Sequence, residues 1–435
     1  MNESDSGDTN GGGGSVRRRD LLRAAGVTGA LGAVGAAGLA AGQSDEDSQG
    51  EFPAHQPARD PPRAYEEYTV HRVPEQYDTI QRAVEAAEPR DLVLVGPGVY
   101  NEAVTVTDTP ELTIRGTDRN EVILDGEFTR EDGVLATVDD VVVENMTARN
   151  YQRNGFFWSS VTGWRGSYLT AYNNRVYGIY NIDSRHGRYH DCYASGHTDS
   201  GFYVGECDPC HARLENVRSE NNAIGYSGTN AGGYLTVTDS VFRDNMGGIV
   251  PNSLDSEANP PQDSARIQNN LVEGNNNADA PDAAFGYGAF GAGIVVAGGI
   301  NDEIFDNEVR DHANYGIVVA PMIDDNLYAP RNNLVRGNTV SNSGRADLAV
   351  GAPQGGDNRF RDNDADTSRP SGLAGGPRLV GGDPMVLTVM LEQFAQLELG
   401  SSPRGDWRTA PEPPFDELAS MPDPETEPPR EAVRR

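Results

Sequence analysis

Residues 201–250 read GFYVGECDPCHARLENVRSENNAIGYSGTNAGGYLTVTDSVFRDNMGGIV and contain three glycines that each precede an apolar residue in a similar context. The pattern extends in both directions along the chain, with separations of 23, 23, 24, 23, 45 and 23 residues. This period, with short apolar runs and no helical periodicity, predicts a solenoid whose turns pack on one another. The value of 45 predicts either an insertion or a second turn without the motif. The pairs are Gly155-Phe156, Gly178-Ile179, Gly201-Phe202, Gly225-Tyr226, Gly248-Ile249, Gly293-Ile294 and Gly316-Ile317.

Residues near these glycines predict the inside and the corners of the solenoid. Five apolar residues that follow a glycine share one register and are expected to form a buried row: Ile179, Phe202, Ile249, Ile294 and Ile317. Asparagine tolerates left-handed backbone angles and its amide can bond from turn to turn, so the recurrent asparagines are assigned to corners. His197 has the same offset from its glycine as Asn174 and is expected at a corner as well. The corner asparagines are Asn154, Asn174, Asn222, Asn245, Asn269, Asn270, Asn307, Asn333 and Asn338.

The segment before the repeats predicts a short helix followed by strands. Residues 79–87 place Ile80, Ala83, Val84 and Ala87 on one helical face, which is expected to cap the first turn. A buried strand over residues 91–95, a Gly-Pro-Gly turn and a second strand over 100–106 follow.

These segments carry a family resemblance. The stretch TIQRAVEAAEPRDLVLVGPGVYNEAVTV (79–106), continued by LTIRGTDRNEVILDG (112–126), resembles the opening of pectate-lyase-like proteins. The repeats over 130–365 resemble the right-handed β-helix superfamily, which includes pectate lyases, mannuronan epimerases and nitrous oxide reductase maturation proteins. The resemblance covers about two thirds of the chain. It implies an all-β fold, a single-stranded right-handed parallel β-helix with an N-terminal capping helix.

One short motif resembles the epimerases only in part. Residues 177–183 read YGIYNID, whereas the epimerase motif is Tyr-Gly-Phe-Asp-Pro-His-Asp. Tyr180 and Asn181 stand where that motif has Asp and Pro, so its catalytic roles are not transferred. The run over 201–253 also resembles exported bacterial and archaeal β-helix proteins of unassigned activity, which implies a fold but no reaction.

Charge is the strongest feature of the composition. The chain has 66 acidic and 35 basic residues, a net charge of −31, and no lysine. Dense surface carboxylates hold water and ions, and high salt screens their repulsion, so this composition resembles that of a halophile. Binding to nucleic acid depends on clustered basic residues, which are scattered here, so a nucleic-acid partner is not expected. We expect a monomer.

The N-terminus predicts export. Residues 17–23 read RRRDLLR and precede a soft Ala/Gly/Leu stretch over 24–41, which resembles a twin-arginine signal over residues 1–42. That stretch is poorly suited to span a membrane, and no cysteine marks a site for lipid attachment. A secreted protein is therefore expected. The predicted domains are a polar linker (43–64), the β-helix (65–380), a C-terminal capping segment (381–400) and a Pro/Glu-rich tail (401–435) that is disordered or draped on the surface.

The register of the repeats identifies candidate catalytic residues. Asp183, Glu206 and Asn230 each lie five residues after a repeat glycine, so stacking about 4.8 Å apart would align their oxygens. With Arg185, we interpret Asp183 and Glu206 as the candidate catalytic residues. Paired acids can hydrolyse a glycosidic bond, and Ca²⁺ with an arginine base can abstract the proton beside a uronate.

Two long excursions predict a groove. Residues 251–265 and 321–330 leave neighbouring turns at one place, while the turn between them is tight. Loops on a rigid scaffold commonly carry sites. These two contain carboxylates that can bind calcium or act on a sugar: Asp255, Glu257, Asp263, Asp324 and Asp325.

A second candidate site is one that would bind a metal ion. All three cysteines and four of the seven histidines fall between residues 186 and 211. Cys207, Cys210 and His211, with His186, have a spacing that can hold copper or zinc through thiolates and imidazole. The same cysteines can instead form a disulfide, since an exported protein meets oxidising conditions, or react as thiols.

Three functions follow from these alternatives. The first is an exported protein that binds or modifies polysaccharide as a lyase, epimerase or hydrolase. The second is copper handling of the nitrous oxide reductase maturation kind. The third is a non-catalytic surface or adhesion module, which requires only the solenoid.

Overall fold

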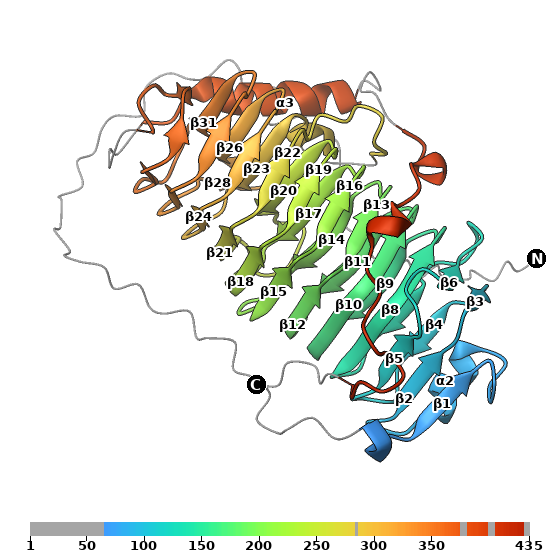
Figure 1. Ribbon diagram of the computed structural model, residues 1–435. Helices are drawn as coiled ribbons and strands as arrows, with labels where there is room; N and C mark the ends of the chain where they lie inside the picture. The colour runs from blue at the N-terminus through green and yellow to red at the C-terminus, as the bar shows by residue number, and fades with distance from the viewer. Residues whose placement is uncertain (1–64, 283–285, 375–380, 399–404, 430–435) are drawn as a thin grey trace, which may run out of the picture.

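The chain winds into a parallel β-helix (Figure 1), as predicted. The computed structural model describes residues 65–282, 286–374, 381–398 and 405–429. Each regular turn gives one strand to an 11-stranded sheet, called sheet B here, and two to a 21-stranded sheet, called sheet A. Sheet A consists of two columns of strands that the long strands β8 (Val141–Arg149) and β10 (Thr162–Tyr172) join.

The strands of each column stack in chain order. Sheet B contains β4 (Val104–Val106), β7 (Val134–Ala136), β9 (Asn154–Ser159), β11 (Tyr177–Ile182), β14 (Ser200–Gly205), β17 (Ile224–Thr229), β20 (Gly247–Asn252), β23 (Ala292–Ala297), β26 (Tyr315–Ala320), β31 (Ala346–Val350) and β34 (Ser368–Arg369). The first column of sheet A contains, besides β8 and β10, β1 (Val70–Val73), β2 (Leu92–Val95), β5 (Thr113–Gly116), β12 (Arg185–His190), β15 (Ala212–Glu215), β18 (Gly232–Thr238), β21 (Asp263–Gln268), β24 (Glu303–Phe305), β29 (Leu334–Arg336) and β32 (Arg359–Arg361). The second contains β3 (Gly98–Tyr100), β6 (Val122–Asp125), β13 (Tyr193–Ser195), β16 (Arg218–Glu220), β19 (Val241–Arg243), β22 (Leu271–Glu273), β25 (Glu308–Arg310), β30 (Thr339–Ser341) and β33 (Asp364–Ala365).

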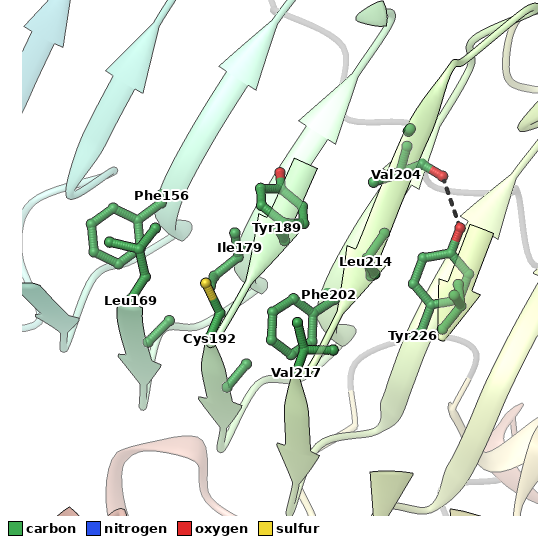
Figure 2. Packing of buried hydrophobic residues seen from close by; sticks show 14 of the residues in the cluster. Phe156, Leu169, Ile179, Tyr189, Cys192, Phe202, Val204, Leu214, Val217 and Tyr226 are labelled. Atoms are coloured by element: carbon green, nitrogen blue, oxygen red, sulfur yellow. Dashed lines mark hydrogen bonds between the residues drawn. The ribbon is translucent and has the colours of Figure 1, made fainter. Parts of the chain in front are cut away.

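The predicted apolar row forms the core beneath sheet B. Ile179 pairs with Phe202, and Ile294 pairs with both Ile249 and Ile317. All five are fully buried. Figure 2 shows part of this packing, in which side chains from the two sheets interdigitate around Phe202. The repeat glycines are needed because successive turns approach closely: a Cβ on Gly178 would lie 2.6 Å from the Gly201 carbonyl oxygen.

Asparagines form the predicted ladders at the corners. The Asn222 backbone N–H donates to Asn245 Oδ1 over 3.0 Å, and the Asn245 N–H donates to Asn275 Oδ1 over 3.2 Å. His197 takes the equivalent place one turn earlier, where its N–H donates to Asn222 Oδ1 over 3.0 Å. The corner role predicted for His197 is therefore confirmed, and the ladder satisfies buried amide groups in successive turns.

The wide spacing between Gly248 and Gly293 is an insertion. Strand β20 pairs directly with β23, so the 45 residues form one turn with two excursions, over 253–262 and 274–291. The second excursion contains the short helix η2 (Gly286–Ala289). The predicted loop after β26 contains a hairpin, β27 (Met322–Ile323) and β28 (Leu327–Tyr328).

A helix forms at the position predicted before the repeats, and a second helix lies within residues 381–400. Helix α2 (Ile80–Ala86) begins where the Thr79 hydroxyl accepts from the Arg82 N–H over 3.2 Å, and it buries Ile80, Ala83 and Val84 against the first strands. A 3₁₀ turn, η1 (Tyr65–Glu67), precedes it. Helix α3 (Pro384–Glu398) lies along the outer face of sheet B (Figure 1), where Val386 packs with the outward side chains of the sheet.

The C-terminal segment lies against the solenoid. Over residues 405–429, Trp407 is 8% and Met421 3% exposed, which corresponds to the second of the two alternatives predicted for the tail, a segment draped on the surface. The Arg115 guanidinium donates to the Pro424 carbonyl over 3.0 Å and the Glu427 carbonyl over 2.6 Å. The segment contains η3 (Trp407–Thr409) and η4 (Phe415–Glu417). We call residues 405–429 the strap.

Two further predictions bear on the membrane and the leader. None of the helices in the described ranges has the length and apolar character needed to cross a bilayer. The predicted signal (1–42) and linker (43–64) lie outside the described residues.

Candidate functional site

The predicted catalytic row is aligned as expected. The N–H groups of Asp183, Glu206 and Asn230 each donate to a carbonyl of the next turn, over 3.1, 2.9 and 2.8 Å. All three have left-handed backbone angles, with φ of 47°, 55° and 47°, which places them at one corner after sheet B. Asp183 is exposed and accepts from the Ser160 hydroxyl over 3.1 Å. Arg185 is exposed at the start of β12.

The predicted Cys/His metal site is not formed. Cys207 and Cys210 are joined in a disulfide and are fully buried in the core, so no thiolate pair faces the histidines. The rings of His186 and His211 stack 4.6 Å apart, and His211 stacks on Tyr234 at 4.7 Å. Burial, followed by the charge of Arg185, lowers the pKa of His211. Over the described ranges, no three His, Cys, Asp or Glu side chains gather into a group that could hold a metal ion.

A pocket lies on the outer face of sheet B, and of the two loops predicted to form a groove, one lines it with Leu254 and Glu257 and the other with Met322. Its floor comes from β11, β14, β17, β20 and β23, and its walls come from the loop after β20, η2, β27 and α3. The space within it, counting the open solvent at its mouth, is about 670 Å³. The lining residues are Tyr177, Asp199, Tyr203, Ile224, Ser227, Thr229, Val250, Asn252, Leu254, Glu257, Gly288, Ala289, Val295, Ala297, Met322 and Met390.

Asp199 supplies the first carboxyl group of this pocket. It lies in the turn just before β14, and its Oδ2 accepts from the Tyr177 hydroxyl over 3.2 Å. Burial raises the pKa of Asp199 to about 7, and the negative charge of Asp282 acts in the same direction. The hydrogen bond from Tyr177 opposes this rise.

Glu257 supplies the second carboxyl group, from the loop after β20. Its Oε2 accepts from the Tyr203 hydroxyl over 2.6 Å. Burial raises the pKa of Glu257 to about 7, with further contributions from the charges of Glu206 and Asp199. Burial also raises the pKa of Glu206, and Asp183 contributes to that rise. The predicted row therefore adjoins the pocket through Glu206.

Aromatic side chains continue from the pocket along sheet B. Phe157, Tyr180 and Tyr203 occupy equivalent positions on β9, β11 and β14. The rings of Phe157 and Tyr180 stack at 4.6 Å, and Tyr177 stacks on Tyr180 at 4.2 Å. Phe157, Tyr177 and Tyr180 are half-buried, whereas Tyr203 is 2% exposed. Beyond Tyr203 the same row continues with Ser227 and Val250, where the face becomes aliphatic.

The other loop carboxylates hold the walls in place. Asp255 accepts from the Asn326 N–H over 2.6 Å and from its side-chain amide over 2.7 Å. Asp324 in turn accepts from the Asp255 N–H over 2.8 Å. The two predicted loops are thus joined to each other, and of the five carboxylates named from the sequence, Glu257 lines the pocket.

The arrangement suits general acid–base chemistry. Burial raises the pKa of both carboxyl groups to about 7, so near neutral pH each of them can donate or accept a proton. The sequence named Glu257 as one of several loop carboxylates and did not single out Asp199. The feature of the sequence that could have identified Asp199 is its position two residues before the repeat glycine Gly201, close to aromatic residues.

Comparison with known proteins finds similarity to solved structures alone. No protein-family model and no curated protein matches the chain in sequence. Among solved structures, the chain is similar to the Azotobacter vinelandii mannuronan C-5 epimerase AlgE6 A-module, with 14% identity, 67% of this chain and 87% of that chain covered, and a TM-score of 0.43. An alginate lyase from Paenibacillus sp. FPU-7 shows 15% identity over 66% of this chain and 95% of that one, with a TM-score of 0.41. The catalytic domain of an α-1,3-glucanase of family GH87 shows 12% identity, coverage of 74% and 71%, and a TM-score of 0.41.

Proposed function

We propose that this protein is a secreted glycoside hydrolase that cleaves a polysaccharide in the pocket on sheet B. One observation carries the proposal: Asp199 and Glu257 line the same pocket and both have pKa values raised to about 7. Hydrolysis of a glycosidic bond uses a pair of carboxyl groups, one protonated and one ionised.

The charges around each group favour different roles. Glu257 has two carboxylate neighbours, Glu206 and Asp199, which favour its protonated form. Asp199 accepts a hydrogen bond from Tyr177, as Glu257 does from Tyr203, but it has only one carboxylate neighbour, Asp282, among the groups that act most strongly on it. We therefore assign Glu257 as the general acid and Asp199 as the base or nucleophile.

Water is the co-reactant in the proposed hydrolysis. The bond between the anomeric carbon and the bridging oxygen breaks, and Glu257 gives its proton to that oxygen. The oxygen of water forms the new bond to the anomeric carbon, and its proton passes to a carboxylate. Where Asp199 acts as base it takes this proton directly. Where Asp199 acts as nucleophile it bonds to the carbon first, and Glu257 then takes the proton from the water that releases the sugar.

Location and salt dependence belong to the same proposal. The signal-like segment over 1–42 and the charge of −31 fit a protein that is folded before export and works in high salt. Helix α2, whose Ile80, Ala83 and Val84 are buried at the start of the solenoid, is proposed to cap it.

The test is a panel of polysaccharides assayed for new reducing ends in molar salt. Glu257→Gln and Asp199→Asn are each expected to lower the rate by about 10²–10⁴-fold, the usual contribution of an acid or base. The matched control is Asp364→Asn, an exposed carboxylate on sheet A. A substrate with an activated leaving group should restore the Glu257→Gln rate, because that group leaves without a proton. Absence of cleavage across the panel, or equal rates in wild type and both variants, would overturn the proposal.

A further inference from the structure

The pocket concentrates negative charge without a matching positive charge. The groups that act most strongly on the pKa values of Asp199, Glu257 and Glu206 include tyrosine hydroxyls, backbone amides and other carboxyl groups. Within the part of the chain that the structure describes, neither arginine nor histidine lines the pocket. The chain contains no lysine that could serve instead.

The fold does place arginines beside carboxylates elsewhere. Arg165, Arg188 and Arg213 occupy equivalent positions on β10, β12 and β15 of sheet A. Arg188 and Arg213 lie 2.9 and 3.0 Å from Glu215, and Arg165 lies 3.7 Å from Glu144. The lack of a cation is therefore a local property of this pocket and not a consequence of the composition alone.

A uronate ring would bring a further carboxylate into this site. Like charges a few ångströms apart repel strongly in a partly buried site, where water screens them poorly. Recognition of a sugar carboxylate ordinarily uses a charge-assisted donor such as arginine. The pocket instead offers the small polar side chains Ser227, Thr229 and Asn252 together with an apolar wall that includes Leu254 and Met322.

We infer that the pocket selects an uncharged sugar ring and excludes uronates. This inference rests on the proposed hydrolytic function and names its substrate class. The hydroxyls of a neutral ring fit the polar floor, and its C–H faces fit the apolar wall. The aromatic side chains Phe157, Tyr177 and Tyr180 extend the same uncharged surface along sheet B.

The experiment compares matched neutral and acidic ligands by titration calorimetry on the full-length protein. The probes are the hexasaccharides of β-1,4-glucan, β-1,3-glucan, α-1,4-glucan and β-1,4-mannan, each paired with the same hexasaccharide oxidised to the uronate at C6. The Glu257→Gln variant prevents turnover, and Asp199 keeps a carboxyl group in the pocket. At least one neutral member is expected to bind about 100-fold more tightly than its acidic partner at the lowest salt that keeps the protein folded.

Two additional measurements identify the cause of the selectivity. Binding of the acidic partner should strengthen as salt is raised, because screening weakens the repulsion. Ser227→Arg, which places a cation on the floor of the pocket, should narrow the difference at least tenfold, whereas Ser227→Asn should leave it unchanged.

The outcomes separate this inference from the proposed function. Equal or tighter binding of a uronate, or binding of neither partner, overturns the inference, while loss of cleavage in the Asp199 and Glu257 variants would still support hydrolysis. Selective binding of a neutral glycan without any cleavage supports the inference as a binding specificity and removes the hydrolytic proposal.

Discussion

The Tyr203 hydroxyl lies 2.6 Å from Glu257 Oε2, so one hydrogen bond joins a strand of sheet B to the loop that follows β20. Both side chains line the pocket, and Tyr203 is 2% exposed. The bond favours the ionised carboxylate, while burial and the nearby carboxylates favour the protonated form. The protonation of Glu257 near pH 7 is therefore set by a balance that a single hydroxyl can shift.

Replacing Tyr203 with Phe should raise the pKa of Glu257 further above its usual value, because the opposing hydrogen bond is lost. If Glu257 is the general acid, the alkaline limb of the profile of kcat/KM against pH should move to higher pH by roughly one unit. Tyr315→Phe, a buried tyrosine on β26 of the same sheet, is the control. An alkaline limb that stays in place would contradict this assignment.

Asp302→Asn should stabilise the protein at alkaline pH. Burial raises the pKa of Asp302 to about 8, whereas the unfolded chain loses this proton near its usual pKa of 3.8. The folded state therefore binds more protons between these values, and the free energy of unfolding falls as pH rises through them. Asparagine cannot ionise, and its amide can join the ladder in which the Asp302 N–H already donates to Asn333 over 2.8 Å.

For Asp302→Asn, we expect a gain of roughly 1–3 kcal/mol above pH 8 and little change near pH 4. Thermal unfolding at a series of pH values measures it, with the exposed Asp306→Asn as control. A gain of equal size at every pH would show that the ionisation of Asp302 is not responsible.

Asn245→Ala should destabilise the solenoid. Asn245 Oδ1 accepts from the Asn222 N–H over 3.0 Å, and its amide donates to the Ser219 carbonyl over 3.0 Å. Because the site is fully buried, alanine would leave both groups without a partner, at a cost of about 2–4 kcal/mol. Denaturant unfolding should show this loss, while Asn101→Ala, which removes one exposed hydrogen bond, should change stability by less than about 0.5 kcal/mol. Similar values for both variants would mean that the ladder contributes little.

Met421→Asp should release the strap and leave the turns intact. Met421 is 3% exposed, and its N–H donates to Asn145 Oδ1 over 2.8 Å. A carboxylate in that place costs about 2–3 kcal/mol, so the detached population should rise more than about tenfold. Limited proteolysis followed by mass spectrometry should show faster cleavage within 405–429 and unchanged thermal unfolding of the solenoid. Glu425→Ala is the exposed control, and equal cleavage rates in the two variants would exclude the predicted release.

Thiol labelling should find no reactive cysteine in the folded protein and one after unfolding. Cys207 and Cys210 are joined in a disulfide, and burial raises the pKa of Cys192 to about 12, so its thiolate is scarce. Unfolding in denaturant without reductant exposes Cys192 alone. Three labelled cysteines under those conditions would show that the disulfide is absent and would return the thiolates to the metal hypothesis.

The register of the solenoid could be predicted because it depends on spacing. The fixed period placed Ile179 over Phe202 and Asp183 beside Glu206, and it identified His197 as a corner residue before any geometry was known. The pocket could not be predicted in this way. Asp199 and Glu257 line one pocket because an excursion from one turn folds over the strands of earlier turns. The period of the repeats does not indicate where such an insertion packs.

The cysteine pair shows a different limit. A C-x-x-C spacing permits a disulfide or a pair of metal ligands, and the choice depends on whether both sulfurs face the core. In the structure they do, while His186 and His211 stack outside on the corner. For the strap, the Pro/Glu-rich composition left disorder and draping on the surface as alternatives, and it did not indicate that Trp407 and Met421 would be buried against the solenoid.

The asparagine ladders also bear on how such a molecule can change over time. Asn222 and Asn245 are 23 residues apart, while Asn245 and Asn275 are 30 apart and Asn270 and Asn307 are 37 apart. All three pairs nevertheless make the same bond, at 3.0–3.2 Å. The number of residues between two asparagines of a ladder therefore does not change the hydrogen bond that joins them. During evolution, the segments that form the walls of the pocket can therefore become longer or shorter or be exchanged, and new substrates can be acquired. The hydrogen bonds that stabilise the turns carrying these segments stay the same.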